Sequence, residues 1–380
     1  MKKVLPLLLV CLMLVPFPAL AQDEEPSDLE NVYQIVDEQG NAITSVCGTP
    51  EAGDEYISGD NHHFRLKSVN TDDKTAVAES LGLFELPDVS WLDAEASLPV
   101  SAGKTKKIAM YCTHSDESYV PTDGTSAKPG KGSIYDVAGN LKTNLEKLGV
   151  TVDQSTATHE PHDSGAYRRS RQTAMKLVQG GPDAVFDIHR DGIPNPDEYT
   201  VKLGNESASK VRLEVGRSNQ NSSANKDFAA QIKAVADKMH PGLVKDIFIG
   251  KGTYNQDLSP RSVLLEFGTH TTSKERAATS TAAMADVLYK TLYGGVSGAA
   301  GSASDVGPSN NAQANQVTNT PSTETNTGAG SGILWVVGVF VAGLIIFALI
   351  ATGSKQGAMQ KLKRNASEMT GGLFGKKPQK

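Results

Sequence analysis

The chain has 380 residues and a formal net charge of −6, a length that allows about two domains. The acidic balance excludes proteins that bind nucleic acid through a large positive charge, so no nucleic-acid partner is expected. Of the cysteines, Cys11 lies in the N-terminal apolar run, and Cys47 and Cys112 fall in different predicted domains. A disulfide framework is therefore not expected, and the fold must be held by its core.

The first 21 residues have the form of a secretory signal peptide. Lys2 and Lys3 precede an apolar run over residues 4–17, and Ala19-Leu20-Ala21 is a small-x-small cleavage site. The alternative is an uncleaved N-terminal anchor. Either reading places the body of the protein outside the cytoplasm.

A second apolar run lies near the C-terminus and predicts one transmembrane helix over residues 332–353. Residues 333–351 are apolar throughout, about the length needed to cross a bilayer. The tail at 354–380 is rich in Lys and Arg, whereas 296–331 has neither. The tail is therefore expected in the cytoplasm and the body on the outer side of the cell membrane. Residues 294–331, mostly Gly, Ser, Ala, Thr and Asn, predict a flexible tether.

Residues 22–86 predict a small β-rich N-terminal module. Strands are expected at 32–36 and 42–46 around a turn at 37–41, with a second hairpin pattern over 55–66. Residues 87–106, which hold a Trp, a Pro and a Gly, are interpreted as a linker.

Residues 107–293 alternate between strand and helix patterns, which predicts a three-layer α/β domain with a mixed sheet. Residues 200–204 and 211–216 are expected to pair as a hairpin. The other expected strands are 107–110, 150–152, 184–188, 247–249 and 263–265, and the expected helices are 134–148, 167–179, 225–239 and 272–292.

Three of these strands end in residues that can carry chemistry. Strand 107–110 is followed by His114 and Glu117, strand 184–188 by His189, and strand 263–265 by Glu266. Sites in α/β sheets lie at the carboxyl ends of the strands. Two histidines and two glutamates at such ends suggest one hydrolytic zinc centre.

Catalytic zinc usually takes three protein ligands and one water, whose pKa it lowers toward ~7. His114, Glu117 and His189 are candidate ligands, and Glu266 is a candidate for the base that accepts the water's proton. Structural explanations remain open at this point: His114 packed in a loop, aspartates paired with Arg190, and Glu266 capping the next helix.

Four motifs, in this order, resemble the stage II sporulation protein P family, which are peptidoglycan hydrolases of endospore-forming bacteria. They lie at residues 113–119, 167–171, 187–191 and 254–261, the last together with 264–266. The resemblance covers about residues 32–293. It implies a fold related to the zinc N-acetylmuramoyl-L-alanine amidases, with cleavage of the bond between N-acetylmuramic acid and L-alanine, and an added endopeptidase activity on cross-links.

The resemblance also implies roles for single residues. His114 and His189 match metal ligands, and Glu266 matches the catalytic glutamate. Glu117 is the preferred third ligand, with Asp136 and His159 as alternatives. The implied setting is septal wall hydrolysis during engulfment, with stage II sporulation proteins D and M as partners.

Peptidoglycan stems carry carboxylates, which arginine binds in a bidentate manner. Arg168, Arg171 and Arg190 are therefore predicted to bind substrate, against the alternative of helix-surface charge. The residues predicted to line a groove for sugar or peptide are Tyr254, Asn255 and Gln256.

Two positions depart from the family pattern. Cys112 stands where the family often has His, and a small buried core residue is expected there in preference to a metal ligand. His270 follows Glu266 where the family often has glycines, which leaves a histidine of unassigned role near the site.

Two rival functions stay open from the sequence. One is the same fold acting mainly as an endopeptidase on cross-links. The other is a catalytically silent protein that binds the wall as a scaffold.

Overall fold

The computed structural model describes residues 31–94, 105–163 and 165–294. The predicted signal peptide, tether, transmembrane segment 332–353 and basic tail lie outside these residues. Within the described part of the chain, no helix combines the length and the apolar character that a membrane span requires.

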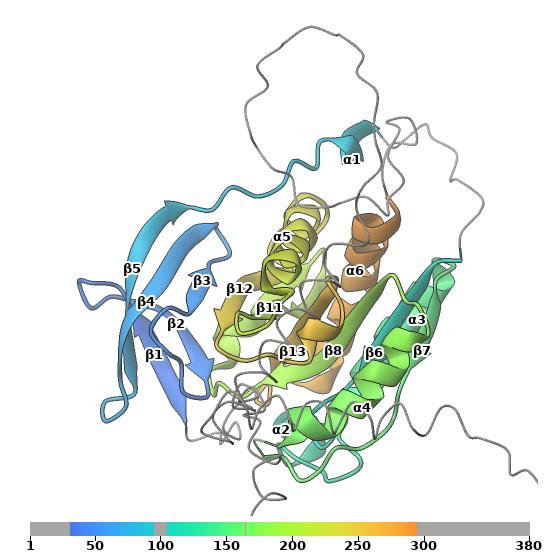
Figure 1. Cartoon of the computed structure of the whole chain (residues 1–380), viewed down its shortest axis with the longest axis horizontal. Coiled ribbons are helices and arrows are strands. Elements are labelled where there is room, and N and C mark those ends of the chain that lie inside the picture. Colours follow the sequence, from blue (N-terminus) through green and yellow to red (C-terminus); the bar gives the residue numbers. More distant parts are fainter. Residues whose placement is uncertain (1–30, 95–104, 164, 295–380) are drawn as a thin grey trace, which may run out of the picture. The chain divides into compact units, whose positions relative to one another are not determined.

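A mixed sheet of eleven strands runs through the described residues in the order β2-β1-β5-β4-β3-β12-β11-β13-β8-β6-β7 (Figure 1). This confirms the predicted α/β class with a mixed sheet. The strands are β1 (Val32–Val36), β2 (Ala42–Cys47), β3 (Glu55–Ile57), β4 (His62–Asn70), β5 (Thr75–Leu83), β6 (Lys107–Tyr111), β7 (Thr151–Gln154), β8 (Ala184–Asp191), β11 (Val211–Gly216), β12 (Val244–Gly250) and β13 (Ser262–Thr269).

Helices cover both faces of the part of the sheet that carries the predicted site. Ile108 and Met110 of β6 belong to the main core, whereas Ala109 and Tyr111 pack in a second cluster with Ala174. Because successive strand residues point to opposite faces, the two clusters lie on opposite sides. The main core takes residues of α3 (Ile134–Lys147), α5 (Ser222–Met239) and α6 (Lys274–Tyr293); the second takes α4 (Ala166–Gln179). The shorter helices are α1 (Trp91–Ala94), α2 (Val120–Asp123), η3 (Pro196–Tyr199) and η4 (Gln256–Leu258).

The three strands predicted to end at the site are neighbours. β6 pairs with β8, and β8 with β13, both in parallel. Their carboxyl ends therefore meet at one edge of the sheet, as expected. Register places Glu266 of β13 opposite His189 of β8.

The β-rich front of the chain continues the same sheet. β3 pairs antiparallel with β12, with Ile57 opposite Ile247. Strands β1 to β5 also have a hydrophobic cluster of their own, which includes Tyr33 and Leu66 and extends to Phe248 of β12. The front is thus joined to the α/β part by both backbone pairing and side-chain packing.

One pairing prediction was wrong. Residues 200–204 were expected to form a hairpin with 211–216, but β9 (Thr200–Leu203) pairs with β10 (Glu206–Ser209) in a separate two-stranded sheet. β11 instead lies between β12 and β13 in the main sheet. It is almost fully buried, so its backbone groups need a partner strand on both sides.

Candidate active site

The loop after β6 carries the first two candidate ligands, and its backbone is fixed by close packing. Thr113 donates to Asp187 from its backbone N, over 2.8 Å, and from its hydroxyl, over 2.5 Å. A Cβ on Gly132 would lie 2.5 Å from the backbone of Asp116 and Glu117, so only glycine allows this approach. The O of Glu117 accepts from the N of Ile134 at the start of α3.

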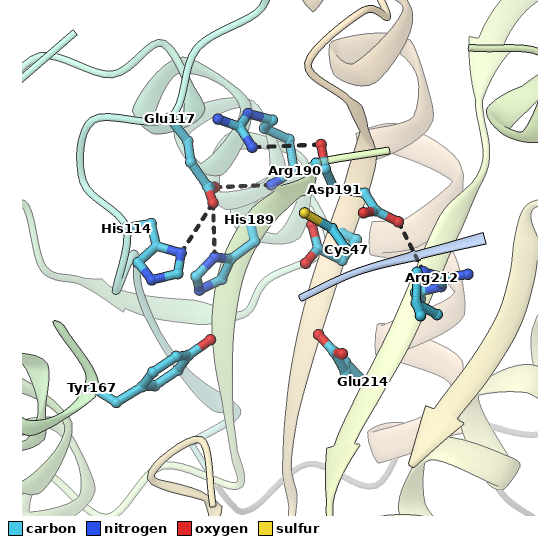
Figure 2. Close-up of a pocket in the computed structure, with 12 residues that line it drawn as sticks. Cys47, His114, Glu117, Tyr167, His189, Arg190, Asp191, Arg212 and Glu214 are labelled. Carbon is cyan, nitrogen blue, oxygen red and sulfur yellow. Dashed lines mark hydrogen bonds and ion pairs between the residues drawn. The ribbon is translucent and has the colours of Figure 1, made fainter. Parts of the chain in front are cut away.

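The loop and β8 bring His114, Glu117 and His189 together, as Figure 2 shows. Nδ1 of His114 lies 3.3 Å from Oε1 of Glu117, and Nδ1 of His189 lies 3.2 Å from the same oxygen. One potential ligand atom from each residue lies within 4.8 Å of the others, and all three residues are buried. These three candidates, far apart in sequence, form a single cluster.

Neighbouring groups orient this cluster. The backbone N of Arg190 donates to Oε2 of Glu117 over 3.0 Å. Nε2 of His189 lies 3.0 Å from Oδ1 of Asp187 but outside hydrogen-bond geometry. A carboxylate beside the second ring nitrogen is a common feature of histidines that bind metal through the first.

The electrostatics of the cluster favour a cation between its members. Burial alone would raise the pKa of Glu117, but the charges of His189 and Arg190 hold it well below its usual range. Burial lowers the pKa of His114 to about 4, so this ring is neutral at pH 7. Burial opposes the charge on His189, yet Asp187 and Glu117 raise its pKa well above the usual value. The site thus already favours positive charge at His189.

These donors fit zinc. Two imidazole nitrogens and one carboxylate oxygen are a common catalytic zinc set, and Nε2 of His189 is buried without a hydrogen-bond partner among the described residues. The alternative third ligands lie elsewhere. Both ring nitrogens of His159 contact other groups, the O of Cys112 and the hydroxyl of Thr173. Asp136 is exposed and pairs with a lysine of α6.

Glu266 lines the same cavity as the cluster. Its Oε2 is buried and has no hydrogen-bond partner. Burial, reinforced by the negative charge of Asp191, raises the pKa of Glu266 well above its usual value. A carboxyl group with raised proton affinity, on the wall of a cavity beside candidate metal ligands, has the properties of a general base.

The cavity has a volume of about 30 Å³ and includes walls that the sequence did not indicate. Val46 and Cys47 at the end of β2 line it, as does Tyr167 of α4. His162 stacks on His114 with ring centroids 4.0 Å apart, and its Nδ1 lies 2.8 Å from Asp116 Oδ1. The only sequence signal for His162 was its place just before the arginine-rich motif.

The arginines predicted to bind substrate have different surroundings. Arg171 is engaged by Asp257 through two hydrogen bonds of 2.8 and 2.6 Å. Arg190 is buried, and its guanidinium donates to carbonyl oxygens of Ser118 and Ser126 over 3.3 and 3.0 Å. Both guanidinium groups therefore form hydrogen bonds within the protein in this structure. Arg168, next to Tyr167 on α4, is exposed.

The structure buries Tyr254, Asn255 and Gln256, whereas the prediction was that they line a groove. Nδ2 of Asn255 donates to the O of Tyr167 over 3.0 Å, and the side-chain amide of Gln256 bonds the backbone of Glu214 and Gly216. These amides satisfy backbone groups and fix the turn that precedes η4. Their polarity was the basis of the prediction, and internal hydrogen bonding accounts for it.

The two unassigned positions lie off the cavity. Cys112 belongs to the main hydrophobic core, as expected, and burial raises the pKa of its thiol. His270 is buried beyond the end of β13, where its backbone N donates to the O of Asp191. Neither residue is among those that line the cavity.

Fold and site together define an α/β protein with a candidate metal centre at the carboxyl edge of its sheet. Residues 48–289 match the model of the stage II sporulation protein P family. The chain therefore belongs to the stage II sporulation protein P family.

Individual relatives show partial similarity. Stage II sporulation protein P of Bacillus subtilis (strain 168) is 28% identical over 212 residues, which are 51% of this chain and 53% of that protein. The chain thus matches about half the length of that curated relative.

Solved structures give weaker matches. An N-acetylmuramyl-L-alanine amidase of Mycobacterium abscessus has 14% identity and a TM-score of 0.33, covering 49% of this chain and 98% of that one. The CwlD amidase of Clostridioides difficile, solved in complex with the GerS lipoprotein, has 12% identity and a TM-score of 0.34 over 50% of this chain and 96% of its own.

Proposed function

We propose that this protein is a zinc-dependent peptidoglycan hydrolase, an N-acetylmuramoyl-L-alanine amidase. The observation that carries the proposal is the buried cluster of His114, Glu117 and His189, with Glu266 opposite His189 in the sheet register. Membership of the stage II sporulation protein P family supports a wall-degrading role in sporulation. The more specific proposal is hydrolysis of the septal wall during engulfment.

In this proposal His114, Glu117 and His189 would hold the zinc ion. Zinc would supply an acidified water and polarise the carbonyl of the scissile amide. Oε2 of Glu266, which has no protein partner, would accept the proton of the attacking water. It would then pass this proton to the nitrogen of L-alanine, the leaving group. Tyr167, on a cavity wall, would exclude water from one side of the reacting amide.

Metal content and activity, measured together, test the proposal. The purified full chain is analysed for zinc by mass spectrometry and then incubated with purified peptidoglycan, with and without a chelator. We expect about one zinc per chain and chelator-sensitive release of stem peptides. His114→Ala and His189→Ala should lose both zinc and activity while retaining the fold. Near-wild-type activity in either variant would refute the metal assignment.

The same digestion separates the rival functions. Intact stem peptides released from glycan indicate amidase activity, whereas cleaved cross-links with stems still attached indicate an endopeptidase. Binding to insoluble wall without soluble product, with zinc added back, would favour the scaffold.

The setting is also part of the proposal. The body would face the wall, held at the cell membrane by residues 332–353, and stage II sporulation proteins D and M are the proposed partners. Co-purification of tagged protein from sporulating cells, with a non-sporulating culture as control, tests the partners.

A further inference from the structure

The cavity beside the candidate metal ligands is too small for the proposed substrate. Its volume of about 30 Å³ is enough to hold a water molecule. Pockets for drug-sized ligands measure roughly 300–1,000 Å³, and a glycan with its stem peptide is larger. The described conformation can hold a water next to Glu266, but it has no room for the amide and its substituents. Catalysis therefore requires one wall to move.

Among the strands that line the cavity, β2 has the fewest neighbouring strands. It contributes Val46 and Cys47 to the cavity, and β2 is the first strand of the sheet, with β1 as its one neighbour. The other strands at the cavity, β8, β11 and β13, each pair on both sides and carry His189 or Glu266 or their neighbours. Moving any of these would dismantle the site.

Side chains, in place of another strand, hold the free edge of β2. The N of Ser45 donates to Oε2 of Glu198 over 3.4 Å, and Nη2 of Arg212 donates to the O of Ser45 over 3.0 Å. The backbone N–H and C=O of Ser45 bond these side chains, so both backbone groups point away from β1. We call these two contacts the Ser45 clamp.

The neighbouring residue strengthens the clamp. Oγ1 of Thr44 accepts from Arg212 over 3.2 Å and from Lys245 over 2.9 Å. Arg212 is itself fixed by two hydrogen bonds to Asp246, of 2.7 and 3.0 Å. The partners of β2 in the clamp are thus rigidly placed, while β2 itself is not paired beyond β1.

Glycines flank β2. Gly40 and Gly48 both have a φ of 85°, in the left-handed region that glycine adopts readily. Small residues at the ends of an element can absorb the backbone rotation of a hinge. The segment between them can therefore swing as one piece.

We propose that β2 is a gate over the metal site, closed by the Ser45 clamp and opened when the wall substrate binds. The need for opening rests on the proposed function, because the glycan substrate is too large for this narrow cavity. Opening would release Ser45 from Glu198 and Arg212 and would expose Cys47.

Cys47 is a native probe of the gate, because Cys112 is fully buried. The experiment uses the full-length, zinc-loaded chain in detergent, with Cys11→Ser as background. Glu198→Ala removes one half of the clamp. Asp197→Ala is the matched control, since Asp197 precedes it in η3 and is exposed. The rate of Cys47 labelling by an aromatic disulfide reagent, zinc content and hydrolysis of peptidoglycan are measured for each protein.

We expect Glu198→Ala to label at Cys47 roughly fivefold faster than the parent, the effect of losing one hydrogen bond. Its hydrolysis should rise and its zinc content should stay the same, while Asp197→Ala matches the parent. Ser45→Pro is a second variant, because proline lacks the N–H that donates to Glu198 and is tolerated on edge strands. Like Glu198→Ala, this variant should increase both the rate of Cys47 labelling and the rate of hydrolysis.

Unchanged labelling in both clamp variants would overturn the gate. Faster labelling without faster hydrolysis would overturn its role in catalysis. If no variant releases product although zinc is bound, the proposed function fails, and the labelling rates still decide whether the clamp controls access to Cys47.

Discussion

The pKa values of two glutamates at one cavity are shifted in opposite directions. The pKa of Glu117 is held low by His189 and Arg190, despite its burial, whereas burial and Asp191 raise the pKa of Glu266. Carboxyl groups whose environments separate them in this way usually have different roles in acid–base chemistry. Glu117 suits a permanently charged ligand, and Glu266 suits a group that takes up a proton.

Glu266→Gln should therefore remove activity without removing the metal. General base catalysis contributes about 10²- to 10⁴-fold, and we expect a loss of hydrolysis in this range with zinc content unchanged. Glu214→Gln, at another carboxylate that lines the cavity, should keep most of the activity. Loss of hydrolysis in Glu214→Gln with retention in Glu266→Gln would assign the base to Glu214.

The identity of the third ligand can be tested by metal affinity alone. Glu117→Gln should weaken zinc binding by more than ~10²-fold, since even residues that only support ligands contribute 10- to 100-fold. Asp136→Asn should leave affinity unchanged, because Asp136 is exposed beside Lys274. Competition with a chelating dye measures both. Equal affinities for Glu117→Gln and the parent would remove Glu117 from the metal site.

The candidate site residues share a sequence signal that their surroundings lack. His114 and Glu117 follow β6, and His189 and Glu266 lie in the carboxyl-terminal halves of β8 and β13. The direction of these parallel strands therefore brings the four residues together. Cys47 carries no such signal, because it reaches the cavity only through the curl of the sheet between β12 and β2. Buried and exposed amides also look alike in sequence, which is why Asn255 and Gln256 were expected on a groove surface.

At the level of elements, the turn before η4 joins α4 to the sheet. Tyr254 and Asn255 both have positive φ, 49° and 56°, a conformation that costs non-glycine residues energy and persists only with support. The support comes from Asn255, whose Nδ2 donates to Tyr167 and Ser170, and from the pair of Arg171 with Asp257.

Asn255→Ala should destabilise the protein by roughly 1–3 kcal/mol, because buried partners of its amide lose their hydrogen bonds. Asn140→Ala is the matched control: its Nδ2 donates to the O of Asp136 on the exposed side of α3, and the change should cost less than ~0.5 kcal/mol. Urea unfolding of the two variants gives the comparison. Equal midpoints would show that the turn does not depend on Asn255.

The residue patterns predicted which strands are present more reliably than which strands pair with each other. β8, β12 and β13 were recognised from their apolar runs, and all three are longer than expected. β11 was expected to pair as a hairpin with residues 200–204, but it lies inside the main sheet. Its charged residue Arg212 is buried there and neutralised by Asp191 and Asp246. The sequence of one strand does not show whether a charged residue is buried beside a partner on another strand.

At the scale of the whole molecule, the pair of Arg212 and Asp246 links the front strands to the α/β sheet, since Arg212 also holds β2. Burial would raise the pKa of Asp246, but the charges of Arg212 and Lys245 lower it to about 2. In the unfolded chain this carboxyl has its ordinary pKa of 3.8, so the unfolded chain binds the proton first as the pH falls. The pair thus stabilises the fold above pH ~4 and loses this contribution between pH ~4 and ~2.

Acid unfolding should reveal this contribution, which is roughly 2 kcal/mol for a shift of this size. Asp246→Asn should lower stability by about 3–5 kcal/mol at neutral pH, because it leaves Arg212 buried without its partner. Its stability should then fall less steeply than the parent's between pH 4 and 2. Urea unfolding at several pH values gives both curves, and parallel curves would contradict the assignment.

Membrane attachment is a prediction from sequence alone, because residues 332–353 lie outside the described residues. The full chain should sediment with membranes, and a chain ending at Ser331 should be released from cells. Each arginine at the centre of a span costs about 2.5–3.5 kcal/mol on insertion, so Ile345→Arg with Ile346→Arg should also release the protein. Asn310→Arg with Asn311→Arg, in the predicted tether, is the matched control and should stay bound. If the truncated chain remained in the membrane, the attachment would have to lie at the N-terminus, and residues 1–21 would act as an uncleaved anchor.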